Sequence, residues 1–504
     1  MTAAMELLKP INLLMVKVGT EPGLEAIPSH IKAFNPRVRT YGIISHPSQP
    51  HTFDEVITSS WESMLGAHPE YLKKGLYVRP ELFKRLRDKE GQLLRMFERV
   101  AIHDLTTVAN PIDPIPLFED STDDRVQLFL RQVAFWDHVF DQHTISAVVA
   151  QNYGHNGWDA VVQAVAEARE VPYLFFHEVR PFLGSLYLHE SVSDLGNLAL
   201  GRKLVMSAVS RGWWAGNSEP RNQVLRNQVG LVQMTPRDPV GEMSTPRLRS
   251  IIHRVGDPTS IAPRLIRSAR RRLRNRNSIR DEKRAITQAA IPEKYLFCEL
   301  QPNPNATTAV KGWMFPDQRE TIAFIAAHLP IGWGLVVKES DRQWSRMYPR
   351  RRNFWTQIAH IPNVYVIDSI SHSEPYVEKC QGVVETSFSS LAFNAVSNGI
   401  PVIIVGHTHI GELQGVRVVT NCEELKIALQ EVSQRDGLRI ARADVAASLE
   451  KFVESVADST IEGALSSMPS FSSSEERSLY VSRLTTNVAG VICSWLAETG
   501  CTRD

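Results

Sequence analysis

One loop places several hydroxyl groups at the expected start of a helix. It follows the predicted strand Val383–Thr386 and leads into the helix predicted over Leu391–Asn398. Backbone N–H groups at the start of a helix lack partners within it and attract anions such as phosphate. The hydroxyls of Ser387, Ser389 and Ser390 would add donors there, although a serine at this position can equally cap the helix. The loop therefore predicts either a phosphate site or a helix cap.

A second loop gathers charged side chains after another predicted strand, Trp333–Glu339. Lys338 and Arg342 carry cations that could neutralise a phosphate, and Glu339 could accept hydrogen bonds from ribose hydroxyls. A solvated cluster of surface charges would give the same pattern. The loop thus predicts nucleotide contacts, with a plain charged surface as the alternative.

A third loop, Gln301–Asn305, follows the predicted strand Tyr295–Leu300. Its prolines stiffen the turn, and the amide of Gln301 offers a donor and an acceptor to a base or a sugar, although turn formation alone would also explain the pattern. Ligands of open parallel sheets bind beyond the carboxyl ends of the strands. We therefore expect the three loops to share one ligand.

Two sets of residues in the N-terminal half could serve an acceptor. Glu178 follows His177 at the end of a predicted strand, and its carboxylate could take a proton from an acceptor hydroxyl. Asn152 and His155 lie in the loop Asn152–Gly157 and could line the acceptor side. Each set has a structural alternative, because acids commonly end strands and such loops commonly turn a strand into a helix.

The elements that must position these loops alternate between strand and helix along the C-terminal half. Pro401–Gly406 and Val416–Thr420 are further short β-branched runs, and Asp317–Leu329 has apolar residues at helical spacing. Such alternation is typical of a parallel sheet with helical crossovers. It predicts a Rossmann-like domain.

The N-terminal half repeats this pattern less regularly. Ile11–Val18, Val38–Ser45 and Ser146–Gln151 match strands, whereas residues 53–141 are aromatic and favour helices. We therefore expect an α/β fold of two Rossmann-like domains, with a helical insertion in the N-terminal half.

These patterns divide the chain into four segments. We expect an acceptor-side domain over 1–200, a basic linker region over 201–290, a ligand-binding domain over 291–465 and a helical tail over 466–504. Within the linker region, residues 264–284 hold ten Lys or Arg against two acids. This segment could contact anionic lipid headgroups, or it could be a solvated linker helix.

The composition is that of an ordinary globular protein. A chain of 504 residues is long enough for two domains, and 43% hydrophobic and 22% charged residues are average values. The net charge of +1 gives no support for nucleic-acid binding.

The cysteines and the N-terminus suggest a location. The five cysteines form no CxxC pair and have no metal-site spacing to histidines, which predicts reduced thiols, no disulfide and no metal. Met1–Pro10 lacks signal-peptide features, and no run of about 18 apolar residues offers a membrane span. We expect a cytoplasmic protein, with peripheral contact to the inner membrane if the basic segment binds lipid.

Several of these loops together resemble the capsular polysaccharide synthesis family, which includes Kdo transferases. The resemblance is carried by Gln301–Pro302, Val336–Glu339, Ser387–Val402 and, in the N-terminal half, Pro172–Glu178. It implies a glycosyltransferase of the GT-B type, with two domains facing across a cleft. It further implies that a sugar moves from a nucleotide donor such as CMP-Kdo to a surface polysaccharide or glycolipid, with no separate cofactor.

Three positions depart from the pattern of that family. Asn303 and Ser340 stand where the family usually has the glutamate of Gln-Pro-Glu and the histidine of Lys-Glu-His-Pro, and Asn394 stands in place of a common acid. Two alternatives follow. The chain could be a sugar-nucleotide epimerase or hydrolase, since fold does not fix the reaction, or a catalytically silent binding protein of polysaccharide assembly.

Overall fold

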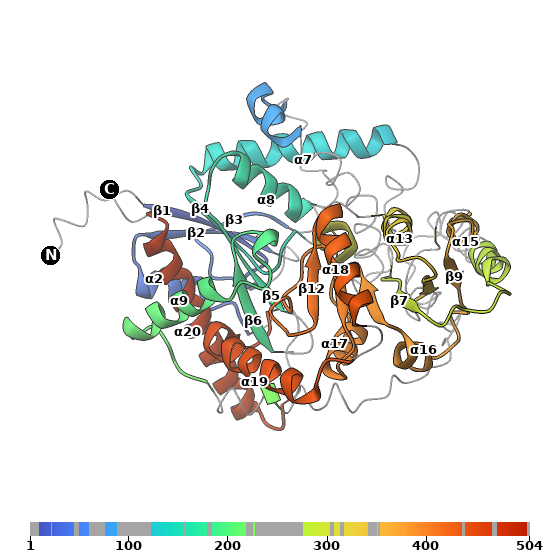
Figure 1. Cartoon of the computed structure of the whole chain (residues 1–504). Coiled ribbons are helices and arrows are strands. Elements are labelled where there is room, and N and C mark those ends of the chain that lie inside the picture. Colours follow the sequence, from blue (N-terminus) through green and yellow to red (C-terminus); the bar gives the residue numbers. More distant parts are fainter. Residues whose placement is uncertain are drawn as a thin grey trace, which may run out of the picture. The chain divides into compact units, whose positions relative to one another are not determined.

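The computed structural model describes most of the chain as two compact α/β units (Figure 1), which confirms the predicted fold class. The first unit contains the described residues up to Arg226 together with those from Glu450 onward, and the second contains those from 276 to Leu449. The described residues are 10–21, 23–44, 50–59, 76–87, 122–154, 158–178, 184–217, 225–226, 276–302, 307–312, 317–340, 350, 353–435, 439–465 and 471–500.

The first unit is built on a seven-stranded sheet in the order β13-β6-β5-β4-β1-β2-β3. Its strands are β1 (Ile11–Val16), β2 (Val38–Ile44), β3 (Glu55–Ser59), β4 (Ala147–Ala150), β5 (Tyr173–Glu178), β6 (Ser185–His189) and β13 (Ile461–Glu462). Neighbours from β3 to β5 are parallel, whereas β6 is antiparallel to both β5 and β13. The order 3-2-1-4-5 is that of a Rossmann sheet, and its winding reverses between β1 and β4.

Helices cover both faces of this sheet. They are α2 (Ile27–Phe34), α7 (Thr122–Gln142), α8 (Trp158–Ala168), α9 (Ala199–Ser210) and α20 (Ser474–Glu498), with the short turn η1 (Val192–Asp194) after β6. The C-terminal helix α20 packs on α2 and α9 over a core that includes Leu13, Leu174 and Phe176. Helices α7 and α8 pack together on the opposite side of the sheet (Figure 1).

The second unit has a six-stranded sheet in the order β12-β11-β10-β7-β8-β9, and all of its strand pairs are parallel. Its strands are β7 (Tyr295–Glu299), β8 (Gly334–Lys338), β9 (Val364–Val366), β10 (Gly382–Glu385), β11 (Val402–Val405) and β12 (Val416–Val419). Read from β9 to β12, with β7 counted as the first strand of the unit, the order is 3-2-1-4-5-6, which is the doubly wound Rossmann order. The winding reverses between β7 and β10.

The helices of the second unit again lie on both faces of the sheet. They are the π-helical turn η3 (Thr307–Lys311), α13 (Gln318–Ala327), α15 (Phe354–Ala359), α16 (Glu374–Lys379), α17 (Ser390–Ser397) and α18 (Cys422–Gln434). Helices α13, α15 and α18 share one core with the sheet, which includes Ile325, Trp355 and Leu429. Helix α17 packs on β10 and β11.

The predicted strands lie within one or two residues of the observed ones, but the predicted helical insertion is partly wrong. Residues 55–59 form β3, an edge strand paired with β2. Its centre, Val56-Ile57-Thr58, is β-branched, and such residues favour strands. Helix α7 does fall in the predicted insertion.

The C-terminal part of the chain departs from the predicted segments. Residues 450–465 were expected in the ligand-binding domain, but their contacts place them in the first unit, which α19 (Arg442–Ser459) enters from the second. Strand β13 then pairs with β6. The final helix begins at Ser474, within the predicted helical tail, because Ser473 caps it by accepting from the Glu476 N–H.

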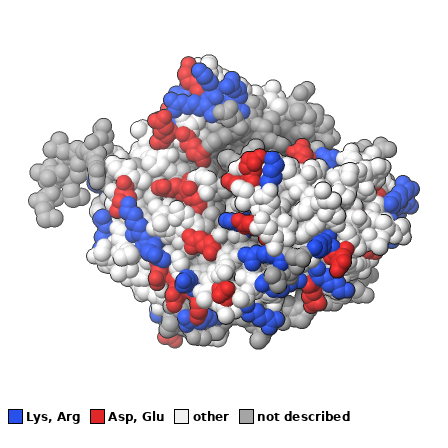
Figure 2. All heavy atoms as spheres, viewed as in Figure 1, with Lys and Arg blue, Asp and Glu red and all other residues white. Residues whose placement is uncertain are grey.

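Within the described residues, no helix is both long and apolar enough to cross a membrane. The same residues contain no group of three or more His, Cys, Asp or Glu side chains arranged for a metal ion. On the face shown in Figure 2, acidic and basic side chains are interspersed.

Candidate functional site

The second sheet brings three loops together at one edge. The loops after β7, β8 and β10 leave the carboxyl ends of neighbouring strands, and β7 and β10 flank the point where the winding reverses. In doubly wound sheets this point is where ligands bind, because the two loops diverge there. The described donor-side residues that the sequence predicted therefore lie at one edge of this sheet.

Gln301 is held in place by the first turn of α13. Its backbone N–H donates to Gln318 Oε1 at 2.8 Å, and Gln318 Nε2 donates to the Gln301 carbonyl oxygen at 2.9 Å. The Gln301 side-chain Nε2 lies 3.5 Å from Glu385 Oε2, at the end of β10. This pair links the loop after β7 to the loop after β10.

A buried ion pair, called the bracing pair below, joins the described residues on either side of the loop after β8. Arg350 Nε and Nη2 donate to the two carboxylate oxygens of Glu339 at 2.8 and 2.6 Å, and both side chains are at most 1% exposed. Arg350 Nη2 also donates to the Gln301 carbonyl oxygen at 2.9 Å. Glu339 accepts a further hydrogen bond from the Ser340 N–H at 2.9 Å. Since this carboxylate is already paired, the structure favours a bracing role for Glu339 over a contact with ribose.

The loop after β10 contains an unusual serine. Ser387 has a φ of +84°, which a residue with a Cβ rarely adopts, and its side chain is fully buried. Its Oγ has no hydrogen-bond partner among the described residues. Strained backbone and unpaired buried polar atoms concentrate at functional sites. Ser387 is thus the strongest single indication of a ligand in this loop.

Ser389 caps α17, so the capping alternative is realised at this residue. Its Oγ accepts from the Ala392 N–H at 3.1 Å and donates to Glu385 Oε1 at 2.7 Å. Ser390 is the first residue of the helix and is partly exposed. A cap at Ser389 leaves other amides of the first helical turn for an anion.

Two lysines lie buried near these loops. Lys338 ends β8, is fully buried, and has its Nζ 3.4 Å from the Glu339 carbonyl oxygen. Lys311 ends the π-helical turn η3 and is 4% exposed. Burial lowers the pKa of Lys311 to about 7, because a desolvated ammonium group is disfavoured.

A further buried carboxyl group in the second unit belongs to Glu282. Glu282, from the helical segment 276–285, accepts a hydrogen bond from the Ser369 N–H at 3.0 Å. Burial raises the pKa of Glu282 to about 7, and the negative charge of Glu339 adds to this effect. This carboxyl group therefore titrates near neutrality.

Some predicted residues fall outside the described part of the chain. Arg342 and His155 lie there, as do residues 264–275 of the basic segment. The remainder of that segment belongs to the helix 276–285, which buries Ser278 and Glu282 and exposes its basic residues, Arg276, Arg280, Lys283 and Arg284. Lipid contact by this segment stays a prediction.

The first unit places Glu178 and His177 together at the end of β5. Glu178 is partly exposed, whereas His177 is buried and its ring lies 5.2 Å from Tyr153 and 6.2 Å from His189. The two residues point to opposite faces of the sheet because they are consecutive in a strand. The strand geometry therefore does not favour a catalytic role in which the side chains of Glu178 and His177 contact each other.

Asn152 follows β4, at the point where the first sheet reverses its winding. Its Oδ1 accepts from the Tyr153 N–H at 2.9 Å, which fixes the side chain against its own loop. Gly154 approaches α8 so closely that a Cβ would lie 2.4 Å from Ala160 Cα. Close packing against α8 therefore explains why this loop contains a glycine. Asn152 lies in the same loop, at the carboxyl edge of the sheet.

Sequence reasoning missed Arg350, Glu385 and Lys311. Arg350 stands among three consecutive arginines, and only the fold shows which one meets Glu339. Glu385 opens the loop that the sequence analysis identified, and a carboxylate at the end of a strand could have marked it as a site residue. Lys311 carried no signal, because the hydrogen bond to its backbone carbonyl comes from His407, in the distant loop after β11.

Comparisons with known proteins give no family. No protein-family model and no curated protein matches the chain. Among solved structures, the UDP-GlcNAc 2-epimerase from Methanocaldococcus jannaschii is 11% identical with a TM-score of 0.26, over 88% of this chain and 98% of that one. The spinosyn rhamnosyltransferase SpnG with spinosyn aglycone is 11% identical with a TM-score of 0.23, over 89% and 96%. Scores this low carry no argument, so the site rests on its own geometry.

Proposed function

We propose that the second unit binds a nucleotide-activated sugar between the loops after β7 and β10, and that the protein is a glycosyltransferase. The observation that supports this most is Ser387, a buried hydroxyl on strained backbone at the winding reversal of a doubly wound sheet. The start of α17 and the cation of Lys338 lie at the same edge. Together they suit a phosphate ester.

A CMP-sugar such as CMP-Kdo is the donor that we favour. This choice comes from the resemblance of the loops to the capsular polysaccharide synthesis family, and so does the acceptor, a surface polysaccharide or a glycolipid. In that arrangement Gln301 would meet the base or the sugar, and Ser387 and Ser390 would meet the phosphate.

Sugar transfer requires a base for the acceptor and charge stabilisation for the leaving group. The acceptor oxygen attacks the anomeric carbon, the bond from that carbon to the phosphate oxygen breaks, and its electron pair leaves with the nucleotide. Glu178 is our candidate for the carboxylate that takes the acceptor proton, because it is partly exposed at a strand end. Lys338 and the amides of α17 would stabilise the charge on the phosphate.

The first test is a thermal-shift screen against CMP, CDP, UDP, GDP and their sugar conjugates. A ligand at a hundred times its Kd adds about 2.7 kcal/mol of stability. We expect a cytidine response that is lost in Ser387→Ala, a substitution that removes no hydrogen bond among the described residues. Ser433→Ala, on the exposed side of α18, is the matched control. A flat response across the panel would contradict the proposal.

Turnover assays then separate the alternatives. Transfer of labelled sugar to a polysaccharide or glycolipid acceptor supports the transferase. Conversion of the nucleotide sugar without an acceptor indicates an epimerase or a hydrolase, and binding without any turnover indicates a silent assembly protein.

A further inference from the structure

A cysteine and a histidine that are 94 residues apart in sequence meet in the second unit. Cys422 is the first residue of α18, His328 directly follows α13, and both residues are partly exposed. The Cys422 Sγ lies 3.1 Å from His328 Nε2, at hydrogen-bonding distance. A thiol in direct contact with an imidazole is an activated nucleophile when the imidazole can take the thiol proton.

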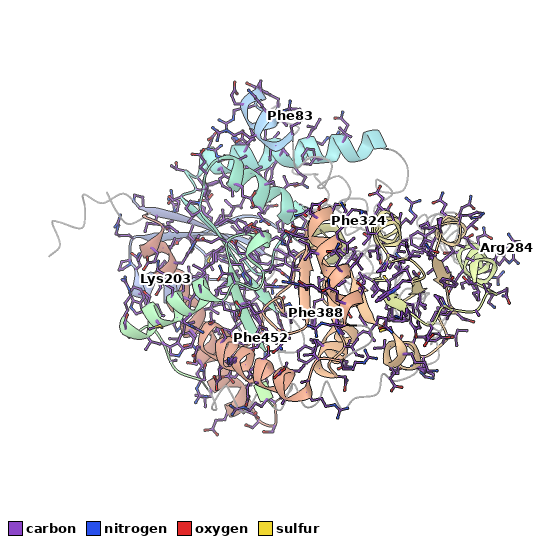
Figure 3. All side chains as sticks on the ribbon, in the orientation of Figure 1. Phe83, Lys203, Arg284, Phe324, Phe388 and Phe452 are labelled. Atoms are coloured by element: carbon purple, nitrogen blue, oxygen red, sulfur yellow. The ribbon has the colours of Figure 1, made fainter. Side chains whose placement is uncertain are left out.

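The contacts of the imidazole decide which of its nitrogens can act as the base. His328 Nδ1 lies 2.7 Å from the Phe324 carbonyl oxygen, four residues earlier. A carbonyl oxygen can only accept, so Nδ1 carries the hydrogen and Nε2 presents its lone pair to Cys422. The Phe324 ring, labelled in Figure 3, also packs on the imidazole, with the ring centroids 4.8 Å apart. The histidine is therefore held in the tautomer and orientation that accept a proton from the thiol.

The start of α18 favours a negative charge on the sulfur. This helix has 13 residues, and its cap, Asn421, accepts from the Glu424 N–H through Oδ1 at 3.0 Å. The N–H groups of Cys422 and Glu423 precede this bond and have no acceptor within the helix. They give the first turn a partial positive charge, which stabilises a thiolate at this position.

The acidic side chains of the first turn are directed to other partners. Lys426 Nζ donates to Glu423 Oε1 at 2.8 Å, so the acid next to Cys422 is paired with a cation. Glu424 Oε2 accepts from the backbone N–H and the hydroxyl of Thr420 at 2.7 and 3.0 Å. The charge of the sulfur is therefore governed mainly by the histidine and by the start of the helix.

The other cysteines that the structure describes are placed differently. Cys298, Cys380 and Cys493 are 5%, 1% and 1% exposed. Burial raises the pKa of Cys380 and of Cys493 to about 12, and it also raises the pKa of Cys298. These three thiols stay protonated near neutrality and are shielded from reagents. They provide internal references for the reactivity of Cys422.

We propose that Cys422 is a reactive thiol that is reversibly modified by low-molecular-weight disulfides, with His328 as its proton acceptor. His328 Nε2 takes the thiol proton, and the thiolate attacks one sulfur of the disulfide. The S–S bond of the reagent breaks, a mixed disulfide forms on Cys422, and the second sulfur leaves as a thiolate that takes up a proton. One disulfide is consumed and one thiol is released, so the step needs no other oxidant. The inference is independent of the proposed function, because neither residue is assigned to the candidate site.

The experiment is the reaction of the full-length protein with glutathione disulfide at about pH 7. Peptide mass spectrometry reads each cysteine separately, including Cys501, which lies outside the described residues. In the wild type, Cys422 should form the mixed disulfide at least about tenfold faster than the three buried cysteines, and dithiothreitol should reverse the modification.

Two histidine variants test the role of the imidazole. His328→Gln keeps a polar side chain but removes the base, and it should slow the reaction of Cys422 about tenfold. His360→Gln is the matched control, because His360 also follows a helix and its Nδ1 lies 2.6 Å from the Thr356 carbonyl oxygen four residues earlier. This variant should react like the wild type.

A spectroscopic measurement tests the charge of the sulfur without changing the histidine. A thiolate absorbs in the ultraviolet more strongly than a thiol, so at about pH 7 the wild type should show an excess absorbance over Cys422→Ser. The corresponding excess should be absent between His328→Gln and the double variant that also carries Cys422→Ser. This comparison stays decisive for the wild type even if His328→Gln unfolds more easily in urea.

Each outcome decides the inference. A reaction of Cys422 that slows in His328→Gln but not in His360→Gln, together with the thiolate absorbance of the wild type, supports it. Absence of that absorbance in the wild type overturns it, as does a Cys422 that reacts no faster than the buried cysteines. A faster reaction in His328→Gln would also overturn it, because the histidine would then shield the thiol rather than activate it.

Discussion

Arg350 and Glu339 form an ion pair whose side chains are 1% and 0% exposed. Removing two charges from water costs free energy, and their mutual attraction offsets this cost only while both charges are present. The pair also holds the Gln301 carbonyl oxygen through Arg350. The brace therefore couples the stability of the second unit to the shape of the candidate site.

Removal of Arg350 should be strongly destabilising. In Arg350→Met the Glu339 carboxylate stays buried without its cation, and we expect the free energy of unfolding to fall by about 3–5 kcal/mol in urea denaturation. The matched control is Arg417→Met. Arg417 pairs with Glu431, but their side chains are 56% and 40% exposed, so its loss should cost no more than about 1 kcal/mol. Similar costs for the two variants would contradict the role of burial.

Glu282 should make stability depend on pH. Its folded pKa of about 7 lies above the usual value of about 4.3, so the folded state binds more protons between these values. The stabilisation is complete below about pH 4 and is lost as the pH rises through 7.

Glu282→Gln should remove this dependence. Relative to the wild type, the variant should gain up to about 3 kcal/mol between about pH 5 and pH 8, measured from urea midpoints across that range. Glu454→Gln, at an exposed position of α19, should gain nothing. If the difference in the free energy of unfolding between the wild type and Glu282→Gln does not change with pH, Glu282 does not titrate in this range.

Among individual residues, those that meet local partners were predictable. Ser389 as a helix cap and Asn421 as the cap of α18 follow from their neighbours in sequence. The partners of Arg350 and Lys311 depend on loops brought together by the sheet order, so no local pattern reveals them.

At the scale of elements, the loop after β11 sets the distance between η3 and the sheet. Gly406→Ala should displace this loop, because the new Cβ would lie 2.2 Å from the Lys311 carbonyl oxygen and the φ is +119°. Gly332→Ala provides the control, since Gly332 has a φ of +79° but open space around it.

The two alanine variants should therefore differ in thermal unfolding. Gly332→Ala should cost about 1 kcal/mol for its backbone conformation alone. Gly406→Ala should cost about 1–3 kcal/mol more, and it should also weaken the nucleotide response. Equal losses of stability in the two variants would mean that the loop after β11 shifts without displacing η3.

The parallel strands were predictable as elements because each is a short apolar run between helices. Strand β3 was not, because it is an edge strand of five residues inside a region rich in helical residues. The antiparallel β6 and β13 were also missed. Strand β13 has two residues, and its pairing with β6 joins segments more than 270 residues apart, which no local pattern specifies.

At the scale of the molecule, the end of the chain completes the first unit. Helix α20 packs on α2 and α9, and Trp495 Nε1 donates to Glu190 Oε1 at 2.8 Å. Ala215 N–H donates to Asn487 Oδ1 at 2.8 Å, again from a segment far away in sequence. The first unit therefore requires the C-terminus, whereas the second is formed by one continuous stretch of described sequence, 276 to 449, apart from its gaps.

This division predicts that damage to α20 stays within the first unit. Trp495 is 1% exposed, and Trp495→Ala should cost about 3–5 kcal/mol because a large buried ring is replaced by a cavity. Hydrogen exchange followed by mass spectrometry should show faster exchange in peptides from β1, β4 and β5. Peptides from β7 and β10 should exchange as in the wild type, since their sheet has its own core.

Leu479→Ala on the same helix provides the control for this prediction. Leu479 is 52% exposed, so its truncation should change stability by no more than about 0.5 kcal/mol and leave all peptides unaffected. If Trp495→Ala instead accelerates exchange equally in the peptides of both sheets, the two units unfold as one, and their division into independent cores is wrong. If it accelerates exchange only around α20, the helix is an appendage rather than a part of the first core.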